Sequence, residues 1–169
     1  MNKQILLCVE TNSRARIDYQ YISETIKRFY EDNRKISYKP IFLGSKTKFN
    51  DKGKLKEIEK YTKSFPGNTE VIYFIDYDDG DTSATTLDLF NRIKNFCETK
   101  GYYFVYFVKD VEDVYLGKQV SDNEKIKYLE YFKRKSLINN IKLSNLQNCL
   151  IKQHCSNILV VLDNFWKRK

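Results

Sequence analysis

The sequence predicts an α/β protein with an open, mostly parallel four-stranded sheet. Short runs of apolar, β-branched and aromatic residues alternate with segments whose apolar residues recur every three or four positions. Four strands and three intervening helices follow one another between residues 4 and 108, and this order is typical of parallel strands joined by crossover helices. The run at 71–75 is apolar throughout, as in a strand buried on both faces. We therefore expect the strand order 2-1-3-4, with helices on both faces of the sheet.

Each element has its own signal in the chain. We expect strands at 4–9, 36–43, 70–76 and 102–108, and amphipathic helices at 16–31, 55–65 and 87–97. Pro40 lacks an amide hydrogen, so strand 36–43 is expected at an edge of the sheet. Thr82 and Ser83 are side chains that can cap the helix after the third strand.

The C-terminal residues follow a different pattern. We divide the chain into an α/β domain at 1–120 and a mainly helical extension at 121–169 that packs on the same domain, because no Pro- or Gly-rich linker separates them. Helices are expected near 121–135, 141–151 and 157–166, with Ile126, Leu129, Tyr131 and Phe132 on one face. The run Ile158–Leu162 fits either a helix or a fifth strand.

Charge and composition limit the classes of function. The net charge is +8, which suits either a lysine-rich soluble surface or a protein that binds nucleic acid. The four cysteines have no zinc-site spacing, and we interpret them as structural. His154 is the only histidine, so a metal site or catalytic triad that uses histidine would depend on it alone.

The sequence gives no signal for a membrane. The apolar stretch before Glu10 is too short for a secretory signal, and no run approaches the roughly 20 apolar residues of a spanning helix. We expect a cytoplasmic protein without a membrane partner.

Acidic residues follow two strands that should be neighbours. Glu10 ends the first strand, and Asp76, Asp78 and Asp79 end or follow the third. In the order 2-1-3-4, these strands lie side by side, and open α/β sheets bind ligands at such a point. Asp76 and Asp78 alternate in an extended chain, so both can face the same side. An oxygen-only set of ligands without His or Cys suits Mg²⁺ or Mn²⁺.

These residues carry a resemblance to a known family. A strand ending in Glu10, two βα units, and a strand ending in Asp76-Tyr77-Asp78 resemble the glutamate and DxD motif of a Toprim domain. The chain is most similar to the compact Toprim proteins of bacterial and phage-defence context, the OLD-type and RloB-like nucleases. Those proteins also have an acidic motif after the fourth strand, where Glu112 in KDVEDVYLG would correspond. Two departures are that Thr11 stands where the family usually has Gly, and that KDVED lacks an Asn-Pro-type lead-in.

The resemblance implies metal-dependent phosphoryl transfer on DNA or RNA. Asp76 and Asp78 would hold Mg²⁺ or Mn²⁺, Asp79 or Glu112 would help to place a second ion, and Glu10 would bind metal or act as general acid or base. Contacts to nucleic acid are expected from one lysine after the fourth strand and from a basic run: Lys109, Lys133, Arg134, Lys135. The chain has no GxxxxGK[ST] loop, so any ATPase, or other defence-system protein, would be a separate partner.

Two other classes of protein share features with this sequence. A haloacid-dehalogenase-type phosphatase also has a DxD after a strand, but places it on the first strand, and Gly80 stands where that family has Thr or Val. A non-catalytic Toprim-like module that binds a partner protein or nucleic acid remains an alternative to the nuclease.

Overall fold

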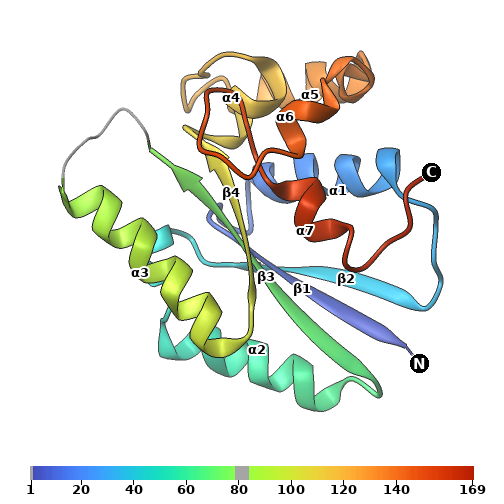
Figure 1. The fold of residues 1–169 in the computed structure, drawn as a ribbon, viewed down its shortest axis with the longest axis vertical. Coiled ribbons are helices and arrows are strands. Elements are labelled where there is room, and N and C mark those ends of the chain that lie inside the picture. The colour runs from blue at the N-terminus through green and yellow to red at the C-terminus, as the bar shows by residue number, and fades with distance from the viewer. Residues whose placement is uncertain (1, 79–83) are drawn as a thin grey trace.

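The predicted sheet is present in the computed structural model, which describes residues 2–78 and 84–169 (Figure 1). Its strands are β1 (Lys3–Val9), β2 (Ile36–Phe42), β3 (Asn68–Tyr77) and β4 (Tyr103–Val108). All neighbouring strands are parallel and the order is β2-β1-β3-β4, as the sequence predicts. Val9 pairs with Phe42 on one side and Phe74 on the other, so the carboxyl ends of the central strands reach the same edge.

Helices cover both faces of the sheet. The helical segments are η1 (Lys46–Lys48), η2 (Leu137–Asn140), α1 (Ile17–Phe29), α2 (Lys52–Ser64), α3 (Ala84–Lys100), α4 (Val111–Leu116), α5 (Lys125–Arg134), α6 (Leu143–Leu146) and α7 (Ile158–Leu162). Side chains on alternate strand positions form two cores. Helices α2 and α3 cover one core, and helices α1, α4, α5 and α7 cover the other (Figure 1). The predicted caps Thr82 and Ser83 lie outside the described residues.

The C-terminal segment contributes to the second of these cores. Leu129 and Phe132 of α5 and Ile158 of α7 are buried in the same cluster as Ile5 of β1. The run Ile158–Leu162 is a helix rather than a fifth strand. The helices expected at 141–151 and 157–166 are much shorter than predicted. In the chain between α6 and α7, Cys155 and Ser156 bond to β4 instead of continuing a helix.

The predicted apolar face of α5 is only half correct. Leu129 and Phe132 are buried, whereas Ile126 is 56% exposed and Tyr131 is 42% exposed. The helical turn of about 100° per residue places Tyr131 far around the helix from Leu129 and Phe132. The exposed Tyr131 therefore faces away from the core.

The edge of β4 that does not pair with β3 is covered by the chain before α7. The amide of Val108 donates to the Cys155 carbonyl at 3.0 Å, and the Ser156 hydroxyl donates to the Tyr106 carbonyl at 2.6 Å. The Asn157 side chain accepts from the Tyr106 amide and donates to the Phe104 carbonyl, both at 3.0 Å. These bonds satisfy backbone groups that an edge strand otherwise leaves open.

No helix in the described ranges is long and apolar enough to cross a membrane.

Candidate active site at the carboxyl edge of the sheet

Glu10 directly follows β1 and reaches the neighbouring strand. Its Oε1 accepts a hydrogen bond from the backbone amide of Asp76 at 2.7 Å. Burial raises the pKa of the Glu10 carboxyl to about 7, although the positive charge of Lys46 and the Asp76 amide both act in the opposite direction. The structure therefore brings together the two residues on which the sequence-based site depends.

Asp76 lies in β3 on the face of the sheet that carries α1 and α4, because it alternates with the buried Phe74 and Ile72. Burial raises the pKa of Asp76 well above its ordinary value. The charges of four further carboxylates raise it more, in the decreasing order Glu10, Asp18, Asp110 and Glu112. These four carboxylates belong to the ends of β1 and β4 and to the first turns of α1 and α4, so several elements place negative charge near Asp76.

Asp18 and Asp110 were not singled out in the sequence. Asp18 lies in the first turn of α1, and its Oδ2 accepts from the Thr11 amide at 3.1 Å. Asp110 caps the N-terminus of α4, where its Oδ1 accepts from the Asp113 amide at 2.7 Å. Burial raises the pKa of both side chains. The signal for Asp110 was its place in the same acidic segment as Glu112. Asp18 follows no strand end, and acidic residues are common in the first turn of a helix, so the sequence gives no signal for it.

Asp78 forms an ion pair with Lys46, which also donates to the Asp76 carbonyl at 3.1 Å. Lys46 begins η1, after β2, in a loop whose lysines looked like solvated surface in the sequence. Burial lowers the pKa of Lys46, but the nearby carboxylates, Glu10 first and then Asp78, raise it more, so the net shift is upward. A charged ammonium therefore stands between Glu10 and Asp78.

Glu112 is fully buried in the first turn of α4. Its Oε2 lies 3.4 Å from the Nζ of Lys125, but neither carboxylate oxygen has a hydrogen-bond partner among the described residues. Burial raises the pKa of the Glu112 carboxyl to about 7, and the charge of Lys125 offsets part of that rise. A buried carboxylate without hydrogen bonds is costly, and a catalytic role or a bound ion is among the explanations for such a group in natural structures.

The other predicted site residues lie around this cluster or beyond it. Asp79 is outside the described residues. Lys109 follows β4 with a left-handed backbone (φ 66°), and its amide donates to the Tyr77 carbonyl at 2.7 Å. The basic run lies at the end of α5, where the Lys133 ammonium donates to Gln20 of α1 at 3.0 Å and Lys135 ends the helix. Arg134 lines a hollow on the outer side of α5.

The donors of this site match a hard divalent cation in chemistry. Every candidate ligand supplies carboxylate oxygens, as Mg²⁺ and Mn²⁺ prefer, and the Glu112 oxygens accept no hydrogen bond from the described residues, although Lys125 lies 3.4 Å away. Within the described residues, no group of three or more acids, histidines or cysteines is already arranged closely enough to hold a metal ion. The fit therefore rests on the chemistry of the carboxylates and their shared position.

Searches against protein-family models, curated proteins and solved structures find no match to this chain.

Proposed function

We propose that this protein is a nuclease that uses Mg²⁺ or Mn²⁺ to cleave phosphodiester bonds in DNA or RNA. The observation that supports it most is that Glu10, after β1, bonds to the backbone of Asp76 in β3, while the charges of Glu10 and of Glu112 in α4 both raise the pKa of Asp76. Carboxylates that raise one another's pKa at the ligand-binding edge of an α/β sheet are typical of active sites. The resemblance to Toprim nucleases adds the expected reaction.

In this proposal, Asp76 and Asp78 are the primary metal ligands, with Glu10, Glu112 and Asp79 as further donors. A bound divalent cation would neutralise charge on the scissile phosphate and activate the attacking oxygen. Asp78 would exchange its present ion pair with Lys46 for this role.

Glu10 suits proton transfer. With a pKa raised to about 7, both its protonated and its charged form are populated near neutral pH, as general acid–base catalysis requires. Glu10 would take a proton from the attacking oxygen or return one to the leaving oxygen.

The cations near the acids suit a substrate with negative charge. Lys46 forms an ion pair with Asp78, and Lys125 forms one with Glu112. Together with Lys109 and the basic run on α5 they would contact phosphates, consistent with the net charge of +8. A role in phage defence, with a separate ATPase or other partner protein, belongs to this proposal through the family resemblance.

The test is cleavage by the purified protein. Wild-type protein with Mg²⁺ or Mn²⁺ is expected to cut or nick labelled DNA or RNA, and EDTA is expected to stop the reaction. Asp76→Asn combined with Asp78→Asn should abolish cleavage, because the primary ligands lose their charge. Glu59→Gln is the matched control, since Glu59 is an exposed carboxylate on α2, on the other face of the sheet. Cleavage that survives the double substitution would refute this mechanism.

The alternative is a non-catalytic module that binds nucleic acid or a partner protein. The ion pair of Lys46 with Asp78 favours it, because an internal cation already offsets part of the negative charge. The two proposals differ in metal binding. Calorimetric titration with Mn²⁺ should give a site that disappears in the Asp76→Asn/Asp78→Asn variant if the nuclease is correct, and no binding if the alternative is correct.

A further inference from the structure

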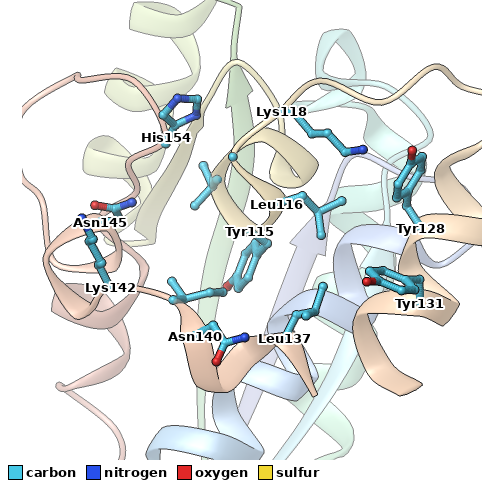
Figure 2. Close-up of a pocket in the computed structure, with 13 residues that line it drawn as sticks. Tyr115, Leu116, Lys118, Tyr128, Tyr131, Leu137, Asn140, Lys142, Asn145 and His154 are labelled. Carbon is cyan, nitrogen blue, oxygen red and sulfur yellow. The ribbon is translucent and has the colours of Figure 1, made fainter. Parts of the chain in front are cut away.

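A cavity of about 490 Å³ opens between α4, α5, η2 and α6, and none of Glu10, Asp76 and Glu112 is among the residues that line it (Figure 2). Its volume falls in the range of small-molecule sites, roughly 300–1,000 Å³. We call it the α4–α5 pocket. The proposed chemistry uses none of the residues that line it.

The outer wall of the α4–α5 pocket is aromatic. Tyr128 and Tyr131 are three positions apart on α5 and so lie on neighbouring parts of its surface. Figure 2 shows both rings along one side of the cavity, with the Lys118 side chain extending toward Tyr128. The Lys118 ammonium lies 4.0 Å from the centre of the Tyr128 ring. Exposed aromatic rings beside cations are the surface on which single-stranded nucleic acids stack their bases.

The charge around the α4–α5 pocket favours an anion. Lys118 and Lys142 lie on opposite sides, and no acidic residue is among the described residues that line the pocket (Figure 2). An adjoining hollow of about 450 Å³ shares Tyr128 and Tyr131 and adds Lys127 and Arg134 against the single acid Glu130. The two hollows together form a cationic surface on both sides of the tyrosines.

Polar groups that can read a base edge complete the pocket. Asn140 and Asn145 each carry an amide that donates and accepts hydrogen bonds. His154 lies on the side of the pocket opposite the tyrosines, and its Nδ1 is 2.8 Å from an oxygen of the buried Asp113 (Figure 2). Unpaired bases are recognised by this combination of stacking and edge contacts.

Helix α4 joins this pocket to the carboxylate cluster. Asp110 and Glu112 at its start belong to the cluster, and Val114 to Gly117 at its end form a wall of the pocket. At 1.5 Å per residue, about 6 Å of helix axis separates Glu112 from Leu116. Successive turns of one helix therefore contribute to the carboxylate cluster and to the pocket, so a strand held in the pocket would lie on the same helix as two of the acids.

We propose that the α4–α5 pocket binds an unpaired nucleotide of the strand that the carboxylate site acts on, with a base stacked on the exposed Tyr131 and phosphates held by Lys142 and Lys118. This inference rests on the proposed nuclease function and specifies its substrate as single-stranded or locally unpaired nucleic acid. A duplex keeps its bases stacked within the helix and does not offer one to the pocket.

Binding of short labelled oligonucleotides, followed by fluorescence anisotropy in EDTA, tests the pocket without any cleavage. Wild-type protein is expected to bind single-stranded RNA or DNA and to prefer it over a duplex of the same sequence. Parallel measurements on RNA and on DNA identify which of the two is preferred. Tyr131→Ala should weaken binding roughly 5- to 150-fold, the usual effect of losing one stacked base, and Tyr131→Phe should retain it.

A matched pair of lysine variants separates the pocket from overall charge. Lys142→Ala should weaken binding and lower the slope of log affinity against log salt by about 0.7, the change for one lost phosphate contact on a single strand. Lys60→Ala removes the same charge from an exposed position on α2 and should change neither quantity. The pocket proposal fails if Tyr131→Ala binds like wild type, if the two lysine variants behave alike, or if wild-type protein does not bind.

The two proposals can fail separately. Asp76→Asn/Asp78→Asn should still bind the oligonucleotide in EDTA while it loses metal-dependent cleavage. Loss of binding in Tyr131→Ala together with cleavage that survives the aspartate substitutions would leave the pocket standing and remove the proposed chemistry. If cleavage depends on the aspartates but Tyr131→Ala binds the oligonucleotide normally, the proposed chemistry stands and the pocket proposal fails.

Discussion

At the level of single residues, the burial of the Glu112 carboxylate lowers the stability of the folded protein near neutral pH, although the same carboxylate is a proposed metal ligand. Its carboxylate is buried, 3.4 Å from Lys125, and without a hydrogen-bond partner among the described residues. The folded pKa of about 7 exceeds the ordinary value of 4.5, so folding favours the protonated form. The contribution of Glu112 to stability is complete below pH 4.5 and is lost as pH rises toward 7.

Glu112→Gln is therefore expected to stabilise the metal-free protein at pH 8 by ~1–3 kcal/mol, because the amide removes a buried negative charge. Urea unfolding in EDTA measures this, and the difference from wild type should shrink toward pH 5. The exposed Glu59→Gln on α2 should give no such gain. A Glu112→Gln protein that is equally or less stable than wild type at pH 8 would show that Lys125 fully compensates the charge.

Lys46 is expected to stabilise the metal-free protein, because it supplies positive charge near Glu10 and Asp78. Lys46→Met should lower the thermal midpoint in EDTA at pH 8, since the carboxylates lose their nearest cation. The same variant should gain more than wild type when Mg²⁺ is added, which differential scanning fluorimetry would detect. Equal Mg²⁺ responses in the two proteins would mean that Lys46 and the metal do not share these carboxylates.

At the level of elements, the turn from β4 into α4 positions Asp110 and Glu112 of the site. Lys109 has φ 66°, a left-handed conformation that costs a non-glycine residue about 1–2 kcal/mol. That conformation turns the chain so that Asp110 caps α4 and Glu112 enters the buried cluster.

Lys109→Gly should keep or slightly raise stability, because glycine adopts this conformation without strain, whereas Lys109→Val should destabilise by ~1–2 kcal/mol. Chemical denaturation of both variants measures the two effects. If the Lys109 ammonium also contacts the scissile phosphate, Lys109→Gly should lose cleavage activity while remaining folded. Full activity in Lys109→Gly would leave this residue with a backbone role only.

The elements also show what the sequence can and cannot predict. The four strands, their order and the meeting of Glu10 with Asp76 follow from local patterns together with the rules of parallel sheets. Asp18, Lys46 and Lys125 could not be assigned in this way, because their positions depend on how helices and loops pack on the sheet. The prediction that Tyr131 lies on the core face is wrong, because the helical period places it far from Leu129 and Phe132. Ile126, which is 56% exposed, shows that the period alone does not say how wide the buried stripe is.

At the level of the whole molecule, residues 121–169 contribute buried side chains to the core on one face of the sheet. Leu129, Phe132 and Ile158 pack in the cluster that covers one face of the sheet, and Asn157 bonds to the backbone of β4. Without them, the outer edge of β4 and the part of that face not covered by α1 and α4 would be exposed to water.

A fragment of residues 1–120 should therefore fail to fold cooperatively, although it contains all four strands and the carboxylate cluster. Circular dichroism with thermal or urea unfolding would show a broad, low-amplitude transition compared with the full chain. A sharp transition and a dispersed NMR spectrum from the fragment would instead establish 1–120 as an independent domain.

The cover over β4 also has a consequence for biosynthesis. Ser156, which bonds to Tyr106, lies 50 positions later in the chain. At a synthesis rate of about 5–20 residues per second, roughly 3–10 s pass between the emergence of β4 and that of its cover. During this interval the nascent chain presents an unpaired edge rich in aromatic residues, which can pair with other chains. Chaperone contact during translation would matter most in that interval.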